Sequence, residues 1–207
     1  MPDGTVHIVD DDAPLRTALI RLCRSAGLDA TGHADASGLL AAIDPGRPAC
    51  ILLDVRLSGD DGLAVQEMVR SMGCTIPIVF LTGYGTIPMT VRAMRGGAVE
   101  FLTKPVDDDA LLDALGRALR ADLDRLATRR DQDELVGRLA SLSPREREVF
   151  GLAIGGLLNK QIAADLGISE ITAKVHKRRV MDKMEARSLA DLVRMAGRLG
   201  VAASRRR

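Results

Sequence analysis

Short apolar runs alternate with helix-period segments through the first half of the chain. The runs that predict strands are Thr5–Val9, a weaker one at Leu28–Gly32, Cys50–Leu53, Ile78–Leu81 and Val99–Leu102. Apolar residues recur with helical spacing between them, in Ala13–Ala26, Ala36–Ile43, Gly62–Met72, Ile87–Arg95 and from Asp108 to about Leu126. Five strands alternating with five helices favour a doubly wound α/β fold. Nearly unbroken apolar runs such as ACILL and IPIVFL predict parallel strands that are buried on both faces.

The second half of the chain lacks strand signals. The charged stretch RADLDRLATRRDQDELVGRL carries a sparse leucine pattern, which predicts a helical connector that extends the fifth helix, with a domain boundary within Ala121–Asp133. After Ser141 the pattern predicts four short helices. Their boundary residues are Ser143 and Pro144 at a helix start, Asn159 as the cap of Lys160–Leu166, Gly167 at the end of that helix, and Ser169 as the cap of a helix running to about Met184. Two helices separated by a glycine-containing turn form the outline of a helix-turn-helix.

The length of 207 residues suits two modest domains. Apolar residues make up 46% and aromatic residues 2% of the chain, so the core must be aliphatic. We expect no membrane partner, because the sequence has neither a signal-peptide pattern nor an uncharged apolar stretch of about 20 residues. Cys23, Cys50 and Cys74 lie in apolar surroundings without metal-ligand spacing, which indicates reduced thiols in a cytoplasmic protein.

The net charge of +1 conceals two halves of opposite sign. Up to Ala121 there are 11 Lys and Arg against 16 Asp and Glu, and from Asp122 onward there are 18 against 12. An acidic half joined to a basic half indicates two functions, the second of them compatible with binding nucleic acid.

Polar side chains follow the predicted strands at their carboxyl ends, where ligands gather in a doubly wound sheet. They are Asp10 and Asp11 after the first strand, Asp54 after the third, Thr82 after the fourth and Lys104 after the fifth. Clustered carboxylates raise one another's pKa values unless a cation neutralises them, and Mg²⁺ or Mn²⁺ suits such oxygen ligands. One carboxylate could then act as a nucleophile on phosphorus. Taken singly, each of these residues would be explained more simply as a solvated cap or turn residue.

The segments VDDDAP, LLDVRLSGDDG, VFLTGYG and EFLTKP resemble, in this order and spacing, the receiver domain of two-component response regulators. The stretch GYGTIPMTVRAMRGGAVEFLTKPVD is especially similar to the FixJ subgroup. The resemblance implies a five-stranded parallel sheet of order 2-1-3-4-5. It also implies a phosphoacceptor, Asp54; metal ligands at Asp10, Asp11, Asp54 and the backbone carbonyl of Arg56; a switch hydroxyl, Thr82; a phosphate-binding lysine, Lys104; and an aromatic switch residue, Phe101.

One departure from the family pattern lies close to the phosphoacceptor. The family usually has Met-Pro where this chain has Leu57 and Ser58. Loss of proline leaves the loop less restricted in φ, which puts its stiffness in doubt but removes no chemical group.

The helix predicted from Ser169 to Met184 has a basic face. Ala173, Val180 and Met184 form one apolar stripe for the core. On the opposite side, Lys174, Val175 and Arg178 would face a major groove, with Thr172, Arg179 and Lys183 placed for phosphates. A solvated basic face is the simpler explanation of such a charge run on its own.

The segments LSPREREV, NKQIAADLGIS and TAKVHKRRVMDKM resemble the LuxR-type helix-turn-helix of the same regulators. The two resemblances imply a receiver domain at 1–121, a helical linker at 122–141 and a DNA-binding domain at 142–207. They imply that a sensor histidine kinase phosphorylates Asp54, that homodimers form on a face including Val91, Arg95 and Glu100, and that the dimer binds double-stranded promoter DNA. The protein is then a regulator rather than an enzyme.

Two other functions remain open. A phosphatase with an aspartyl-phosphate intermediate would need Asp-x-Asp, but Arg56 stands where the second aspartate would be. A DNA-binding protein that uses the receiver fold only as a dimerisation scaffold would have no need of all five pocket residues, yet one sequence does not exclude it.

Overall fold

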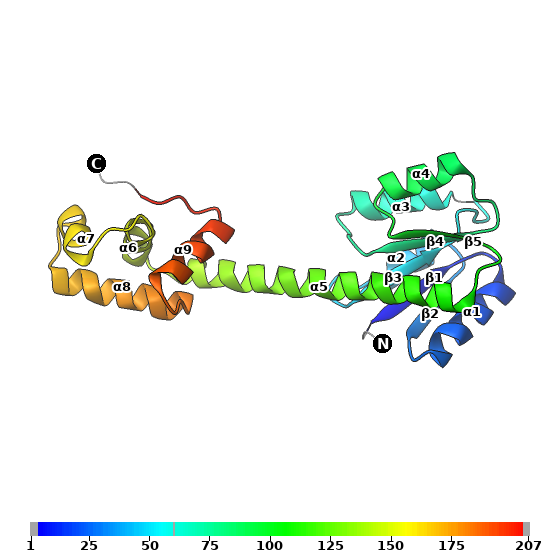
Figure 1. Cartoon of the computed structure of the whole chain (residues 1–207), viewed down its shortest axis with the longest axis horizontal. Helices are drawn as coiled ribbons and strands as arrows, with labels where there is room; N and C mark the ends of the chain where they lie inside the picture. Colours follow the sequence, from blue (N-terminus) through cyan, green and yellow to red (C-terminus); the bar gives the residue numbers. More distant parts are fainter. Residues whose placement is uncertain (1–3, 60, 205–207) are drawn as a thin grey trace. The chain divides into compact units, whose positions relative to one another are not determined.

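The computed structural model of the chain describes residues 4–59 and 61–204, which divide into two compact units after Ala127 (Figure 1). The first unit holds a five-stranded parallel sheet of order β2-β1-β3-β4-β5, which confirms the expected fold. Its strands are β1 (Thr5–Val9), β2 (Asp29–His33), β3 (Ala49–Leu53), β4 (Ile78–Thr82) and β5 (Glu100–Thr103). Its helices are α1 (Ala13–Ser25), α2 (Ala36–Ala42), α3 (Gly62–Ser71), α4 (Ile87–Arg95) and α5 (Asp108–Ala140), the last of which continues into the second unit.

Helices cover both faces of this sheet. One aliphatic cluster joins α1 and α5 to one face, and a second cluster joins α2, α3 and α4 to the other. Every residue of β3 and β4 is buried, as the unbroken apolar runs predict. Phe80 is the one aromatic among the fully buried residues described for this unit, so the core is aliphatic as expected.

A buried carboxylate ties α5 to the base of the sheet. Asp122 is fully buried, its Oδ2 accepts a hydrogen bond from the Ala49 backbone N–H at 3.0 Å, and its Oδ1 accepts one from Arg125 Nε at 2.7 Å. Leu126 is also buried, whereas Leu135 packs into the core of the second unit. The expected helical linker at 122–141 therefore extends the fifth helix, as predicted: α5 continues without a break to Ala140, and its packing is shared between the two units.

The second unit is helical. Besides the end of α5 it contains α6 (Pro144–Ile154), α7 (Asn159–Leu166), α8 (Glu170–Met184) and α9 (Leu189–Arg198). The helix starts at Pro144 and Glu170 are capped by Ser143 and Ser169, as predicted, and Gly167 ends α7 with a positive φ of 64°.

The predicted cap at Asn159 is wrong. Asn159 is the first residue of α7, and its side-chain oxygen has no hydrogen-bond partner. The Gln161 side chain instead reaches back and accepts a hydrogen bond from the Leu158 N–H at 2.8 Å. Among the residues that the structure describes, no helix is both long and apolar enough to cross a membrane.

Replacing Asp122 with Ala should lower the free energy of unfolding of the first unit by about 1–3 kcal/mol, because it leaves the buried N–H of Ala49 without an acceptor. Urea unfolding followed by Tyr84 fluorescence reports on this unit alone, since the chain has one Tyr and no Trp. Asp113→Ala, an exposed aspartate on the same helix, is the matched control and should change stability by less than about 0.5 kcal/mol. Equal effects of the two variants would contradict a structural role for Asp122.

Candidate functional site

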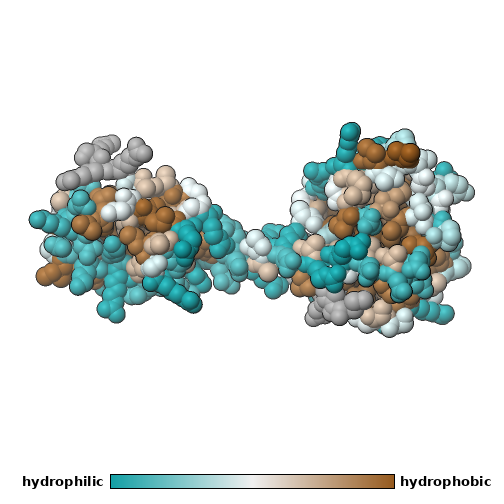
Figure 2. Space-filling view, viewed as in Figure 1, coloured by the Kyte–Doolittle hydropathy of each residue, from teal (hydrophilic) through white to brown (hydrophobic). Residues whose placement is uncertain are grey.

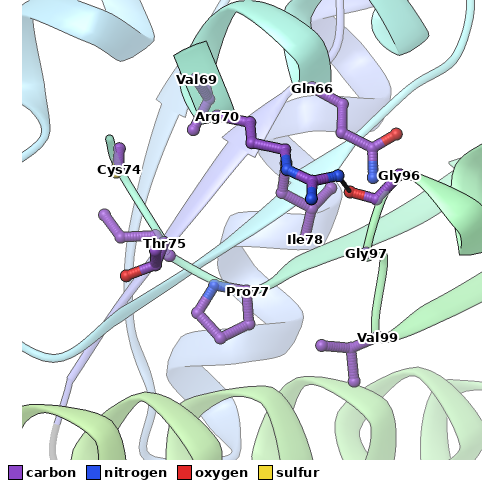
Figure 3. Close-up of a pocket in the computed structure, with 11 residues that line it drawn as sticks. Gln66, Val69, Arg70, Cys74, Thr75, Pro77, Ile78, Gly96, Gly97 and Val99 are labelled. Atoms are coloured by element: carbon purple, nitrogen blue, oxygen red, sulfur yellow. Dashed lines mark hydrogen bonds between the residues drawn. The ribbon is translucent and has the colours of Figure 1, made fainter. Parts of the chain in front are cut away.

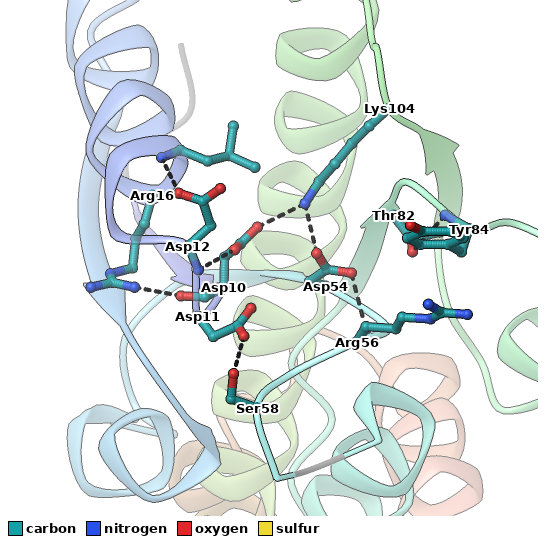
Figure 4. A network of polar contacts seen from close by, with 11 residues as sticks. Asp10, Asp11, Asp12, Arg16, Asp54, Arg56, Ser58, Thr82, Tyr84 and Lys104 are labelled. Atoms are coloured by element: carbon teal, nitrogen blue, oxygen red, sulfur yellow. Dashed lines mark hydrogen bonds and ion pairs between the residues drawn. The ribbon is translucent and has the colours of Figure 1, made fainter.

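The predicted pocket residues do meet at the carboxyl ends of the strands. Asp10, Asp54 and Lys104 directly follow β1, β3 and β5, while Thr82 is the last residue of β4. Parallel pairing of adjacent strands brings these ends to one edge of the sheet (Figure 4).

The Lys104 ammonium lies between two carboxylates. Its Nζ is 2.9 Å from Asp10 Oδ2 and 2.6 Å from Asp54 Oδ2, and these side chains are 4% and 11% exposed. Burial works against the charge of Lys104, but the hydrogen bonds and negative charges of Asp54 and Asp10 outweigh it and raise its pKa. Lys104 therefore stays protonated and neutralises part of the negative charge of the pair.

The loop after β1 is held by its own polar groups. Asp12 caps α1 by accepting a hydrogen bond from the Leu15 N–H at 3.0 Å. Asp10 Oδ1 accepts from the Asp12 N–H at 2.9 Å, and Arg16 Nη1 donates to the Asp10 carbonyl at 2.5 Å. On the facing loop, Asp54 Oδ1 accepts from the Arg56 N–H at 3.0 Å. Both carboxylates are thus oriented by the backbone around them.

Ser58 makes a contact that the sequence did not reveal. Its hydroxyl donates to Asp11 Oδ2, and this hydrogen bond lowers the pKa of Asp11 (Figure 4). Ser58, which stands where the family usually has proline, therefore joins the loop after β3 to the loop after β1 through its hydrogen bond with Asp11.

Thr82 is completely buried, and its hydroxyl oxygen accepts from the Tyr84 N–H at 3.3 Å. The Tyr84 ring in turn lies under the Arg56 guanidinium, which is 3.8 Å from the ring centroid. Neither Tyr84 nor this cation–π contact was predicted, because the two residues are 28 positions apart and no periodic pattern relates them.

Phe101 is half-buried on β5 and packs against Phe80, with ring centroids 5.9 Å apart. Gly85 passes close to it: a Cβ at this position would lie 3.1 Å from a Phe101 ring carbon and 2.8 Å from the Thr103 methyl group. The loop that follows Thr82 at the end of β4 therefore passes close to the Phe101 ring.

The donor atoms of the acidic residues fit a hard divalent cation. Asp10 and Asp54 already accommodate one positive charge, the Lys104 ammonium, and their carboxylate oxygens are the ligands that Mg²⁺ and Mn²⁺ prefer. Within residues 4–59 and 61–204, no group of three or more His, Cys, Asp or Glu has metal-binding geometry. At this pocket Lys104 holds two of the acids and Ser58 holds the third.

The basic face of α8 is exposed as predicted. Ala173, Val180 and Met184 are fully buried. The residues expected to face DNA bases or phosphates lie outside the core. Five of them are solvent-exposed: Thr172, Lys174, Val175, Arg178 and Arg179. The ion pair found among these five is the one from Arg178 to Asp182. In Figure 2 hydrophilic residues predominate on the surface formed by α8.

Lys183 is placed differently. Its ammonium donates to Glu146 Oε2 at 2.6 Å and to the Ser141 carbonyl at 3.1 Å. Glu146 is buried and also accepts from the Ser143 N–H in the capping box of α6. Lys183, which was expected to contact a phosphate, is held in this structure by an ion pair inside the unit.

The expected dimer residues lie along α4 and β5. Val91 is 42% exposed and Arg95 is exposed, while Glu100 Oε2 is 2.9 Å from Arg117 Nη2. Ile87 and Met94, which the sequence prediction did not name, are 82% and 45% exposed and extend the same exposed stripe. Their i, i+4, i+7 spacing with Val91 was the available signal. Figure 2 shows this hydrophobic surface over α4.

A separate hollow lies between the ends of α3 and α4 and the start of β4, at the opposite edge of the sheet from the acids (Figure 3). Arg70 crosses it and donates to the Gly96 carbonyl at 3.4 Å, and the half-buried Cys74 lines it. It contains none of the predicted site residues.

A receiver-type sheet with an acidic edge, followed by an exposed basic helix, defines a response regulator with a DNA-binding domain. The family models agree: residues 6–116 match the response regulator receiver domain and residues 140–196 match the luxR family of bacterial regulatory proteins. The chain belongs to the LuxR-type response regulators, which are two-component transcription regulators.

Relatives of known name span nearly the whole chain. Nodulation protein W of Bradyrhizobium diazoefficiens is 47% identical over 96% of this chain and 88% of its own length. Transcriptional regulatory protein FixJ of Azorhizobium caulinodans is 42% identical over 98% and 96%. The solved structure of the response regulator StyR is 45% identical, with a TM-score of 0.88 over 94% of this chain and 98% of that chain.

Replacing Glu146 with Gln should lower the stability of the second unit at neutral pH by about 1–3 kcal/mol, because it removes the charge that faces Lys183. The hydrogen bond from Lys183 is the main cause that lowers the pKa of Glu146 from 4.5 to about 2. The native pair therefore contributes stability above pH 4.5, and this stability is lost as the pH falls toward 2.

Amide hydrogen exchange of peptides from α6 and α8 measures this stability without interference from the first unit, once each observed rate is divided by the intrinsic rate at that pH to give a protection factor. The protection factors of the Gln variant should depend less on pH between 4.5 and 2 than those of the native chain. Glu148→Gln, which removes an exposed carboxylate paired with Arg145, is the control. Protection factors of the native chain that do not change across this interval would contradict the ion pair.

Proposed function

We propose that Asp54 is the phosphoacceptor of this response regulator and that a sensor histidine kinase is the donor. The supporting observation is the bridge from Lys104 to both Asp10 and Asp54, which places a protonated amine directly beside the carboxylate that would react. Asp54 is only 11% exposed and lies beside Asp10 and Lys104 at the carboxyl ends of the strands (Figure 4).

In the proposed transfer, an oxygen of Asp54 attacks the phosphorus of a phosphohistidine. An O–P bond forms, the N–P bond breaks, and its electron pair stays on the imidazole, which takes up a proton. Lys104 pairs with the new phosphoryl oxygens, and the Arg56 N–H continues to orient the acceptor carboxylate. Mg²⁺, or Mn²⁺, held by Asp10, Asp11, Asp54 and the Arg56 carbonyl, would supply further charge neutralisation.

The phosphoryl group would act on the surface through Thr82 and Phe101. Thr82 is buried with only the weak 3.3 Å hydrogen bond from Tyr84, so a phosphoryl oxygen can compete for its hydroxyl. Movement of this loop changes the contact between Gly85 and Phe101, and with it the surface of α4 and β5. That surface, with Val91, Arg95 and Glu100, is the proposed homodimer face.

The dimer would present two copies of α8 to adjacent half-sites of double-stranded promoter DNA. Lys174, Val175 and Arg178 are assigned to base edges, and Thr172 and Arg179 to phosphates, on the basis of their exposure. Lys183 is left out because Glu146 holds it. Because a transcription regulator must reach the DNA, we place the protein in the cytoplasm. We also propose that it is not an enzyme and that its chemistry is limited to accepting and losing the phosphoryl group.

With acetyl phosphate and Mg²⁺, the native chain should gain one phosphoryl group and shift toward dimer, whereas Asp54→Ala should gain none, because the nucleophile is missing. Intact-mass spectrometry measures the label, and light scattering measures the oligomer. Asp113→Ala, with its exposed carboxylate in the same unit, should behave as the native chain. A labelled native chain whose oligomeric state and DNA affinity stay unchanged would favour the scaffold function instead.

Loss of Arg178 should weaken binding to a preferred DNA sequence by about 1–3 kcal/mol, if it contacts a base edge as proposed. Loss of Arg179 should weaken binding to all DNA sequences alike. It should also reduce, by about one, the steepness with which the logarithm of the binding constant falls with the logarithm of the salt concentration. Duplexes selected from a random pool, titrated at several salt concentrations, separate the two effects. Arg21→Ala removes an exposed charge from the first unit and should alter neither quantity; the same loss in all three variants would argue against a recognition role for α8.

A further inference from the structure

Two of the chain's three histidines are in contact at the edge of the sheet. His7 lies on β1 and His33 on β2, where the register pairs His7 with Thr31 and Val9 with His33. Residues in these paired positions point to one face of the sheet, so His7, Thr31 and His33 lie together. Nδ1 of His7 is 3.1 Å from Nε2 of His33, and the ring centroids are 5.3 Å apart.

This separation matches the distance between two ligands of one metal ion. Two nitrogens bound to tetrahedral Zn²⁺ at about 2.0–2.1 Å lie roughly 3.3 Å apart. The Thr31 hydroxyl completes a triangle, because its Oγ1 is 3.2 Å from His7 Nδ1 and 3.4 Å from His33 Nε2. Only a modest change would therefore admit an ion between the rings.

The surroundings of the pair favour neutral imidazoles beside negative charge. Burial is the main cause that lowers the pKa of both His7 and His33, so near neutral pH their nitrogen lone pairs are not occupied by an additional proton. The hollow that holds the pair is also lined by Asp29, Asp44 and Arg47. Asp29, whose Oδ2 accepts from the Thr5 hydroxyl at 3.1 Å, is the carboxylate whose charge acts on His7.

We propose that His7 Nδ1 and His33 Nε2 bind one borderline transition-metal ion such as Zn²⁺ or Co²⁺. Thr31 lies beside the ion, and water fills the remaining positions. Each ring donates a nitrogen lone pair, and the proton that the rings share in their hydrogen bond moves to the other nitrogen of its ring, so no proton is released. Nitrogen ligands separate this site from the acidic pocket, whose oxygen ligands suit Mg²⁺.

The site is also connected to the acidic pocket. The backbone carbonyl of His33 accepts from the Asp10 N–H at 3.2 Å, directly beyond the paired strands. An ion that fixes β2 against β1 would therefore act on the backbone of a residue of the phosphorylation pocket.

Titration of the full-length chain with CoCl₂, in excess MgCl₂ to occupy the acidic pocket, tests the proposal. The native chain should bind one equivalent with the visible absorption of nitrogen-ligated Co²⁺, and ZnCl₂ should displace it. His33→Gln should weaken Co²⁺ binding by roughly tenfold or more. Mutation of a residue that only orients a metal ligand already lowers metal affinity about 10–100-fold, and His33 is proposed as a ligand itself. His7→Gln provides a second test if circular dichroism shows that one of the variants fails to fold.

His176→Gln removes the remaining histidine of the chain and should leave binding unchanged, and Cys74→Ser controls for binding by the half-buried thiol. Histidine ring resonances in NMR should shift for His7 and His33 but not for His176. Absence of a bound equivalent in the native chain would overturn the site, as would binding that persists at full strength in both His7→Gln and His33→Gln.

Discussion

The bridge from Lys104 to Asp10 and Asp54 is the interaction on which the acidic edge depends. Two like charges about 4 Å apart at a protein surface repel by roughly 4 kcal/mol, and Asp10 is almost completely buried. A single ammonium in contact with both acids removes that conflict, and the Asp12 and Arg56 backbone N–H groups satisfy the remaining oxygens. A phosphoryl group on Asp54 would add negative charge to a pocket that is balanced in this way. Lys104 would then have to divide its hydrogen bonds among Asp10, Asp54 and the phosphoryl oxygens. That rearrangement gives phosphorylation a physical means of acting on the residues around the pocket.

The buried hydroxyl of Thr82 is well suited to respond. It lies at the end of a strand that is buried throughout, so the strand itself offers a rigid support, while the hydroxyl has one weak hydrogen bond among the residues that the structure describes. The following loop passes close to Phe101 at Gly85, where a Cβ would lie 2.8 Å from the Thr103 methyl group and 3.1 Å from the ring. Phe101 also packs into the hydrophobic cluster that contains Met89 and Ala93 of α4, so packed side chains lie between this loop and that helix.

The fold and the membership of the acidic pocket could be predicted from the sequence, because both follow from periodic patterns. Strand runs, helix periods and polar residues at strand ends recur at known spacings, and parallel pairing then brings Asp10, Asp54 and Lys104 together. Contacts between distant side chains leave no such pattern. The Ser58–Asp11 hydrogen bond joins residues 47 apart, and the Lys183–Glu146 pair joins residues 37 apart. The cap of α7 was mispredicted for a related reason, since Asn159 and Gln161 both suit a helix start and only the backbone path decides between them.

The basic half shows why net charge alone identifies no binding face. Lys183 and Arg178 lie one turn or so apart on α8, yet one is held by a buried carboxylate and the other is largely exposed. Each unit also closes its own core, so a change at Asp54 need not alter how α8 is built. In the proposed function, phosphorylation at Asp54 affects DNA binding by α8 through dimerisation. Once the α4 surfaces bring two chains together, the second DNA-binding unit is present at high effective concentration when the first one binds. A modest change in dimer affinity is then sufficient to produce a large change in occupancy of paired half-sites.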